Sequence, residues 1–132
     1  MTSKVTYLGG LRTKNTHIKS GETYITDAPL DNNGKGEAFS PTDTVATGLA
    51  NCMLTVMGIK ARDLNIDISG ATAEVTKTMV SNPRRISRID VVLSFPNTLD
   101  DKFKSTLEKT AVTCPVYYSL HPDIKKNITF NW

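Results

Sequence analysis

SPTDTVATGLANC, residues 40–52, predicts the start of a central helix that carries a cysteine near its middle. Ser40 suits the N-cap, Pro41 the first helical position, and Asp43 the first turn, where the helix dipole favours a negative charge. Apolar residues then recur every three or four positions, which predicts one buried stripe on a helix that ends near residue 62: Val45, Leu49, Cys52, Val56 and Ile59. Small residues in its middle would let another backbone come close.

Outward from this helix, the chain predicts strands before and after it and two further helices near the C-terminus. We expect strands at residues 5–8, 11–18, 22–26, 67–80, 86–95 and 124–132, and a loop rich in Gly, Pro, Asn and Asp at 27–39. A second helix is expected from residue 98 to 114, with the stripe Leu99, Phe103, Leu107, Ala111 and Cys114. Pro115 should end or kink this helix, or begin a third short one at 116–120. No βαβ unit repeats, so we expect an α+β fold with helices on one face of an antiparallel or mixed sheet.

Composition limits the class of protein and its partners. The 132 residues suffice for a single domain, 1–132, with a real core. The net charge of +3 is spread along the chain, which indicates no nucleic-acid partner. We find no run of about 18 apolar residues and no apolar core of a secretion signal, and so expect no membrane span and a cytoplasmic location. Thiols stay reduced in the cytoplasm, and disulfides there tend to be transient and catalytic.

The two cysteines have the most definite chemical possibilities in the chain. Cys52 and Cys114 both fall on inward faces of the two main helices, so packing those helices together could bring the sulfurs within disulfide distance. Such a pair suits reversible oxidation through a sulfenic acid. The alternative is that both are buried as small apolar side chains, as most free cysteines are.

The sequence also offers groups that could tune these thiols. A helix beginning at Pro115 would favour a thiolate at Cys114, so the dipole alone indicates Cys114 as the more acidic thiol. Cys52, in mid-helix, would need a cation nearby. The candidate cations are Arg12, Arg62, Arg84, Arg85 and Arg88, and we choose Arg12.

Acidic groups and metal ligands are less definite. Asp43 and Glu37 are the acids nearest the thiol helix. Asp43 precedes Cys52 by nine positions, on the opposite side of the helix and about 13 Å away along its axis, so its first interpretation is a helix cap. The two histidines, His17 and His121, stand apart and there is no CxxC pair, so we expect no metal and no cofactor.

Two motifs carry a resemblance to a known family. Residues 33–43, NGKGEAFSPTD, followed by small residues and by Cys52 eleven positions after Pro41, closely resemble the start of the central helix in the OsmC/Ohr family. Residues 113–120, TCPVYYSL, resemble the second motif of that family, a Cys-Pro pair that opens the last helix. The family comprises osmotically inducible protein C and the organic hydroperoxide resistance proteins, and this chain is most similar to its OsmC-like branch.

This resemblance implies a fold, an assembly and an activity. The fold would be α+β, with the sheet packed on two central helices in an intertwined homodimer that has its active sites at the subunit interface. The activity would be that of a thiol peroxidase that reduces organic hydroperoxides and hydrogen peroxide and is regenerated by an external dithiol, for example a lipoyl-type one.

The resemblance also implies roles for individual residues. Cys52 would attack the peroxide and Cys114 would resolve the intermediate, which reverses the assignment from the helix dipole. Arg12 would stabilise the Cys52 thiolate, and an acid would orient Arg12. In the peroxidases of the family this acid directly follows the proline. Here that position is Thr42 and the acid comes one place later, at Asp43.

Two other functions fit the same residues. A relative without peroxidase activity could bind a small apolar ligand at the dimer interface, and the Thr42 departure favours it. A structural or interaction protein would leave both thiols inert to oxidant.

Overall fold

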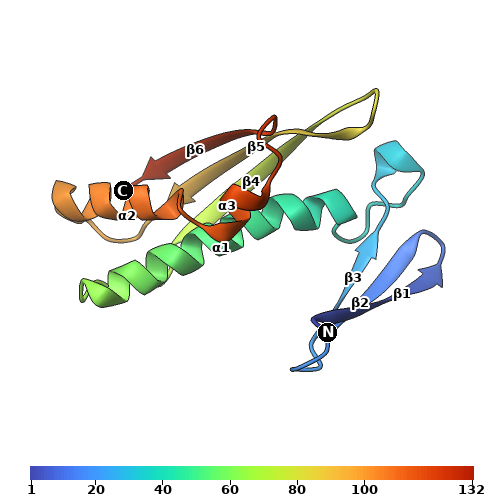
Figure 1. The fold of residues 1–132 in the computed structure, drawn as a ribbon, viewed down its shortest axis with the longest axis horizontal. Helices are drawn as coiled ribbons and strands as arrows, with labels where there is room; N and C mark the ends of the chain where they lie inside the picture. Colours follow the sequence, from blue (N-terminus) through green and yellow to red (C-terminus); the bar gives the residue numbers. More distant parts are fainter. The chain divides into compact units, whose positions relative to one another are not determined.

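The computed structural model describes residues 1–132 and divides into two compact units, residues 1–45 and residues 46–132. The first unit holds an antiparallel sheet in the order β1-β2-β3 and a short 3-10 turn, η1. The second unit holds three helices and a sheet in the order β4-β5-β6 (Figure 1). The bounds are β1 Ser3–Gly9, β2 Arg12–His17, β3 Thr23–Asp27, η1 Leu30–Asn32, α1 Pro41–Asp63, β4 Thr72–Val80, β5 Arg85–Ser94, α2 Asp101–Ala111, α3 Pro115–Ser119 and β6 Lys125–Asn131.

The second unit has one apolar core between its helices and its sheet. β4 pairs antiparallel with β5, and β5 pairs parallel with β6, so this sheet is mixed. The helices lie along one side of the sheet (Figure 1), and inward side chains of β5 alternate as the sequence predicts. The fully buried members of the core are Leu49, Met53, Met57, Ile89, Val91, Leu93, Leu107, Ala111 and Cys114. The α+β class and the apolar stripe predicted for α2 are confirmed, except that Leu99 and Phe103 are only partly buried.

The buried face of α1 differs from the predicted stripe. The side chains that it buries are Ala46, Leu49, Ala50, Met53, Met57 and Ala61. Val45 and Ile59, which we placed in the core, are 44% and 49% exposed. The helix is apolar on more than one side, so a spacing of three or four residues fits two faces equally well. The core of one chain covers only one of them.

Several element boundaries also differ. β4 begins at Thr72, five residues after the predicted start, because Asp67 Oδ1 accepts a hydrogen bond from the Ser69 backbone N–H at 2.8 Å and forms a turn there. α2 is shorter at both ends than predicted. The Cys-Pro pair does begin a third helix, α3. The strands form two three-stranded sheets where we expected one.

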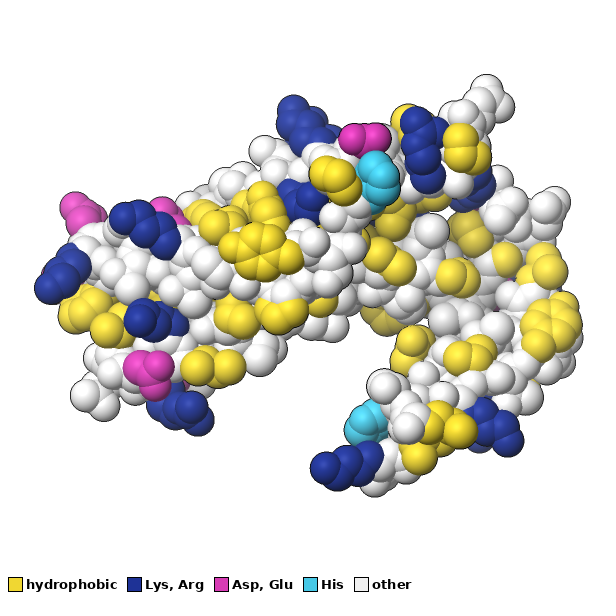
Figure 2. All heavy atoms as spheres, in the orientation of Figure 1, with side chains coloured by type: hydrophobic (Ala, Val, Ile, Leu, Met, Phe, Trp, Pro, Cys, Tyr) yellow, Lys and Arg dark blue, Asp and Glu magenta, His cyan; other side chains and the backbone are white.

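The sheet of the first unit buries almost none of its side chains. β1 has no buried residue, and β3 buries only Thr26 and Asp27. Apolar side chains lie exposed on this unit (Figure 2), among them Val5, Tyr7, Leu8, Tyr24 and Ile25. Exposed apolar area of this kind on a small sheet is typical of a surface that another element covers.

By length and composition, α1 is the one helix that would suffice to cross a membrane. Its most apolar 18-residue window has a mean hydropathy of 1.2, and 33% of that window is buried in the fold. From the sequence we expected no membrane span, because no run of about 18 residues is apolar throughout. The core helix of a protein folded in water meets the same criterion, and the buried residues of α1 belong to the core of the second unit.

Candidate thiol site and arginine cluster

The fold brings the two cysteines of the second unit together. Cys52 is half-buried on α1, and Cys114 is fully buried at the start of α3; both are free thiols. The two thiols lie within interaction distance of each other. From the sequence we expected two remote sulfurs to lie together beside a positive charge; the two sulfurs do lie together, and the cation beside them stays a prediction.

Cys114 caps the short helix that it precedes. Its backbone is extended, and its Sγ accepts a hydrogen bond from the Tyr117 backbone N–H at 3.3 Å. Burial nevertheless raises the pKa of the Cys114 thiol, the neighbouring Cys52 raises it further, and the hydrogen bond from Tyr117 only partly opposes them. Desolvation thus outweighs the backbone N–H groups at the start of α3, so this helix start does not favour a thiolate at Cys114 as the helix dipole alone had indicated.

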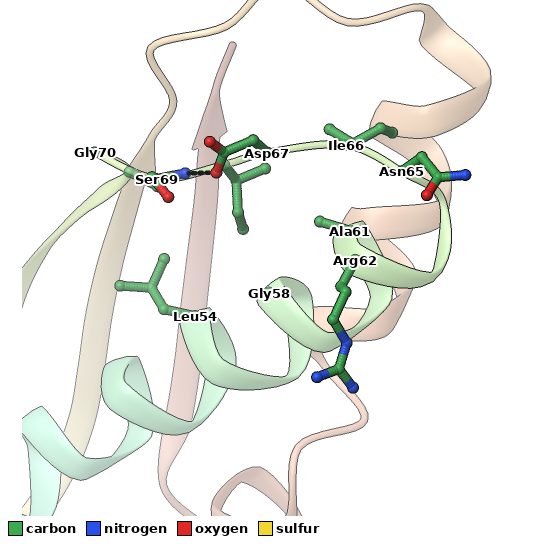
Figure 3. A pocket seen from close by; sticks show the side chains of 11 residues that line it. Leu54, Gly58, Ala61, Arg62, Asn65, Ile66, Asp67, Ser69 and Gly70 are labelled. Atoms are coloured by element: carbon green, nitrogen blue, oxygen red, sulfur yellow. Dashed lines mark hydrogen bonds between the residues drawn. The ribbon is translucent and has the colours of Figure 1, made fainter.

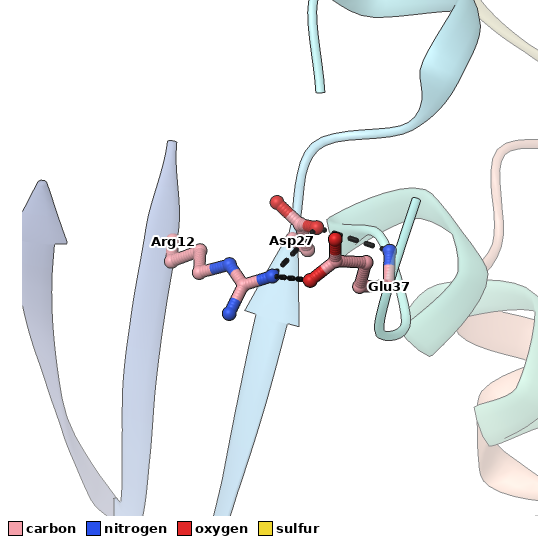
Figure 4. A network of polar contacts seen from close by, with 3 residues as sticks. All are labelled: Arg12, Asp27 and Glu37. Atoms are coloured by element: carbon pink, nitrogen blue, oxygen red, sulfur yellow. Dashed lines mark hydrogen bonds and ion pairs between the residues drawn. The ribbon is translucent and has the colours of Figure 1, made fainter. Parts of the chain in front are cut away.

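Arg12 lies in the first unit and belongs to a cluster with two carboxylates (Figure 4). Its Nη2 forms an ion pair with Asp27 Oδ2 at 3.4 Å and a second, closer one with Glu37 Oε2. Asp27 Oδ2 also accepts a hydrogen bond from the Glu37 backbone N–H at 3.0 Å. This N–H lowers the pKa of Asp27, with Arg12 adding to the effect, whereas burial opposes it.

A tightly folded loop carries Glu37 to this cluster. The backbone N–H of Gly34 donates to Pro29 O at 2.9 Å, and that of Gly36 donates to Ala28 O at 3.1 Å. A Cβ on Gly34 would lie 1.6 Å from Ala28 O, so only glycine fits there. Gly36 has a φ of +62°, in the left-handed region that glycine adopts freely. The fold of this loop therefore requires glycine at positions 34 and 36.

Asp43 takes the helix-capping role. Its carboxylate accepts from the Ser40 backbone N–H at 2.9 Å, and the Ser40 hydroxyl accepts from the Asp43 N–H at 3.1 Å, which together form a capping box. The first interpretation of Asp43, as a first-turn cap, is confirmed. The carboxylates paired with Arg12 are Asp27 and Glu37. A catalytic role for Asp43 stays a prediction.

Sequence reasoning assigned Asp27 to a loop and missed it as a partner of Arg12. The signal that could have found it is the hairpin register: β2 and β3 pair so that Arg12 lies opposite Asp27 and Thr13 opposite Thr26. Once the turn is centred between Lys19 and Ser20, this pairing follows, and opposite charges facing each other on neighbouring strands stabilise the pair.

The other arginines considered for Cys52 have structural partners or lie elsewhere. Arg88 donates to both carboxylate oxygens of Asp90, and Arg85 donates to backbone carbonyls in the turn between β4 and β5. Arg62 lines a separate hollow. No group of three His, Cys, Asp or Glu side chains is placed to hold a metal ion.

That hollow lies at the C-terminal end of α1 and has a volume of about 660 Å³ (Figure 3). Leu54, Gly58 and Ala61 line it from the helix, and residues 65–71 close it from the following loop. Neither cysteine lines it. Another hollow, of about 360 Å³, is lined by residues 36–39 and Asp43 in the first unit.

The comparisons with known proteins place these features in a family. The family model described as OsmC-like protein matches residues 34–129. This chain belongs to the OsmC-like protein family. The matched range contains both cysteines and Glu37, whereas Arg12 and Asp27 lie before it. No curated protein sequence matches this OsmC-like chain.

Solved structures agree with the family. The fold is similar, with a TM-score of 0.96 and 56% identity over 99% of this chain and 96% of the other, to a candidate osmotic stress induced and detoxification response protein of Psychrobacter arcticus 273-4. It is similar in fold to the organic hydroperoxide resistance protein OsmC of Legionella pneumophila, at 13% identity and a TM-score of 0.77, over 100% of this chain and 98% of that one. The organic hydroperoxide resistance protein OhrB of Bacillus subtilis, at 20% identity, has a TM-score of 0.72 over 99% and 98% of the two chains.

Proposed function

We propose that this OsmC-like protein is a thiol-dependent peroxidase that reduces organic hydroperoxides, and hydrogen peroxide, through Cys52 and Cys114. The observation that carries the proposal is the contact between a half-buried thiol on α1 and a fully buried thiol at the start of α3. Membership of a family whose solved members include organic hydroperoxide resistance proteins supports it.

The first step is attack by Cys52. Its thiolate sulfur bonds to the distal oxygen of the hydroperoxide, the O–O bond breaks, and the departing alkoxide takes a proton and leaves as an alcohol. Cys52 is thereby oxidised to a sulfenic acid. Cys52 suits this role because its side chain is only half-buried and a peroxide can reach it. Arg12, of this chain or of a partner subunit, is proposed as the cation that stabilises the thiolate.

The second step is resolution by Cys114. Its sulfur bonds to the Cys52 sulfur, the S–OH bond breaks, and the Cys114 proton leaves with the hydroxyl as water. A raised pKa keeps Cys114 protonated until it is needed, which fits the resolving role. An external dithiol, for example a lipoyl-type one, then reduces the disulfide and is itself oxidised.

We propose a homodimer as the working form. Support comes from the unburied face of α1, which carries exposed Val45 and Ile59 beside Gly48 and Gly58, and from the exposed apolar side chains of the β1–β3 sheet. A second copy of this chain could cover both surfaces, and in this family a dimer is what the resemblance implies.

The test is hydroperoxide consumption by purified protein with cumene hydroperoxide and a dithiol. Cys52→Ser should abolish consumption, and Cys114→Ser should complete one turnover and stop. Thr113→Ser, next to the resolving cysteine, is the matched control and should keep the wild-type rate. After one equivalent of cumene hydroperoxide without reductant, the wild type should lose both free thiols.

Normal consumption by Cys52→Ser would refute the assignment of the attacking thiol. If the wild type keeps both thiols after oxidant, the result favours the second candidate, an OsmC-like protein without peroxidase activity that binds a small apolar ligand at the dimer interface. Thr42, at the position where the peroxidases of the family carry an acid, favours that candidate. A rise in Tm with an apolar ligand, but with no thiol loss, would select it over a purely structural role.

A further inference from the structure

Asp27 combines features that a purely structural surface carboxylate lacks. Its side chain is 1% exposed, and its Oδ1 is the one buried side-chain nitrogen or oxygen of this chain without a hydrogen-bond partner. Its Oδ2 accepts hydrogen bonds from two donors, the Glu37 backbone N–H and Arg12 Nη2. A buried, ionised carboxylate is costly unless a cation pairs with it. Asp27 therefore requires the charge of Arg12.

The same contact fixes where the guanidinium of Arg12 lies. Arg12 and Asp27 are directly opposite in the β2–β3 register, so two paired strands set their separation. Nη2 directs its hydrogens to the two carboxylates, whereas Nε and Nη1 hold no partner within the chain. A guanidinium has donors on all three nitrogens. One edge of Arg12 is thus anchored, and the remaining N–H groups stay available for a thiolate or a peroxide oxygen.

Glu37 is bound to the same nitrogen but in a different environment. Its side chain is 60% exposed, whereas that of Asp27 is almost inaccessible. Solvent and salt screen an exposed ion pair far more than a buried one. The firmer contribution of Glu37 is its backbone N–H, which holds Asp27 Oδ2.

We propose that Asp27 is the positioning residue for Arg12 in hydroperoxide reduction. It takes the part of the acid that, by the family resemblance, follows the proline, a position where this chain has Thr42. Asp43, the acid one place later, is engaged in the capping box of α1. This inference rests on the proposed function, because it names the residue that holds the cation of that site.

The test compares variants of the full-length protein by two readouts. The first is the rate of cumene hydroperoxide consumption, and the second is the pH dependence of Cys52 alkylation by iodoacetamide, followed by mass spectrometry. Asp27→Asn and Arg12→Ala should each slow consumption about tenfold and raise the midpoint of Cys52 alkylation by about one pH unit, since one unit is tenfold in thiolate fraction. The double variant should be no slower than Arg12→Ala alone, because both changes remove the same effect.

One further variant is a matched control, and another compares the two carboxylates that bind Arg12. Glu22→Gln removes an exposed carboxylate of the same unit that lies outside the cluster, and both readouts should stay at wild-type values. Glu37→Gln should slow consumption less than Asp27→Asn does, and 1 M NaCl should reproduce its effect. A larger loss in Glu37→Gln than in Asp27→Asn would overturn the assignment in favour of Glu37.

Three results separate this inference from the proposed function. Wild-type rates and alkylation profile in Asp27→Asn, or multiplied losses in the double variant, overturn the role of Asp27 while the peroxidase stands. If the wild type consumes no hydroperoxide, the proposed function fails, and an unshifted alkylation profile in Asp27→Asn would reject the positioning role as well.

If Asp27→Asn does not fold, as judged by circular dichroism, Asp27→Glu keeps the charge but lengthens the side chain by one methylene. It should then slow consumption, and a wild-type rate in it would overturn the inference.

Discussion

Replacing Gly48 and Gly58 of α1 by alanine tests whether a second helix lies against the side of α1 that the core of the single chain leaves uncovered. Within the single chain, a Cβ at either position meets no atom within 4 Å, and neither glycine has a positive φ. In an isolated subunit, both substitutions therefore add no clash and remove the high conformational entropy of glycine. Each should stabilise the folded state by about 0.8–1.0 kcal/mol.

The size of the expected shift in Tm follows from the chain length. Unfolding 132 residues at about 2.1 cal/mol/K per residue gives an entropy of about 0.28 kcal/mol/K, so 1 kcal/mol corresponds to about 3.6 °C. The glycines are about 15 Å apart along the helix axis, so the two effects should add. For a monomer, the double variant should melt about 6–7 °C higher than the wild type.

In the proposed homodimer the sign is the opposite. A partner helix that approaches the backbone at these glycines would meet each new methyl group, and overpacking of this kind costs about 1–3 kcal/mol per site. We expect both single variants to have a lower Tm than the wild type. Their dimers should also be weaker, so that monomers appear at protein concentrations at which the wild type is still dimeric.

The assay is thermal unfolding by circular dichroism at two protein concentrations, with light scattering for mass. Ser105→Ala, at an exposed position of α2, is the control and should raise Tm slightly through helix propensity alone. A monomeric wild type, together with higher Tm in both glycine variants, would refute a dimer built on this face of α1.

Two further predictions concern the loop and the acid stability. Gly34→Ala should lower the free energy of unfolding by about 1–3 kcal/mol, because the new Cβ would lie 1.6 Å from Ala28 O. The measurement is the urea midpoint, and Lys35→Ala in the same loop is the control, which should change it little. Equal stability of the two variants would contradict the close packing at Gly34. Arg88 and Asn127 lower the pKa of Asp90 to about 2 from 3.8, so its ion pair stabilises the fold fully above pH 3.8 and loses that effect as the pH falls through about 2. Asp90→Asn should flatten this part of the pH dependence of unfolding, and an unchanged acid slope would show that Asp90 does not carry it.

Local sequence chemistry predicts those parts of the site that depend on neighbouring residues. The capping box of α1 needs only Ser40 and Asp43, and the start of α3 needs only Cys114 and Pro115. The inward faces of α2 and β5 follow from simple periodicity, because each element is apolar on one side only. The same argument failed for Val45 and Ile59, since α1 is apolar on two sides and periodicity does not say which one the chain covers.

Residue types, their spacing and the resemblance of two motifs sufficed to predict an OsmC-like α+β fold with two cysteines, a capped central helix and a glycine-rich loop. The three-dimensional fold was needed to show that Cys52 lies beside Cys114, that burial raises the pKa of Cys114, and that the acids of Arg12 are Asp27 and Glu37. Motifs are set by residues close together in the chain. Pairing and desolvation depend instead on which distant segments the fold brings together and on how much water it excludes from them.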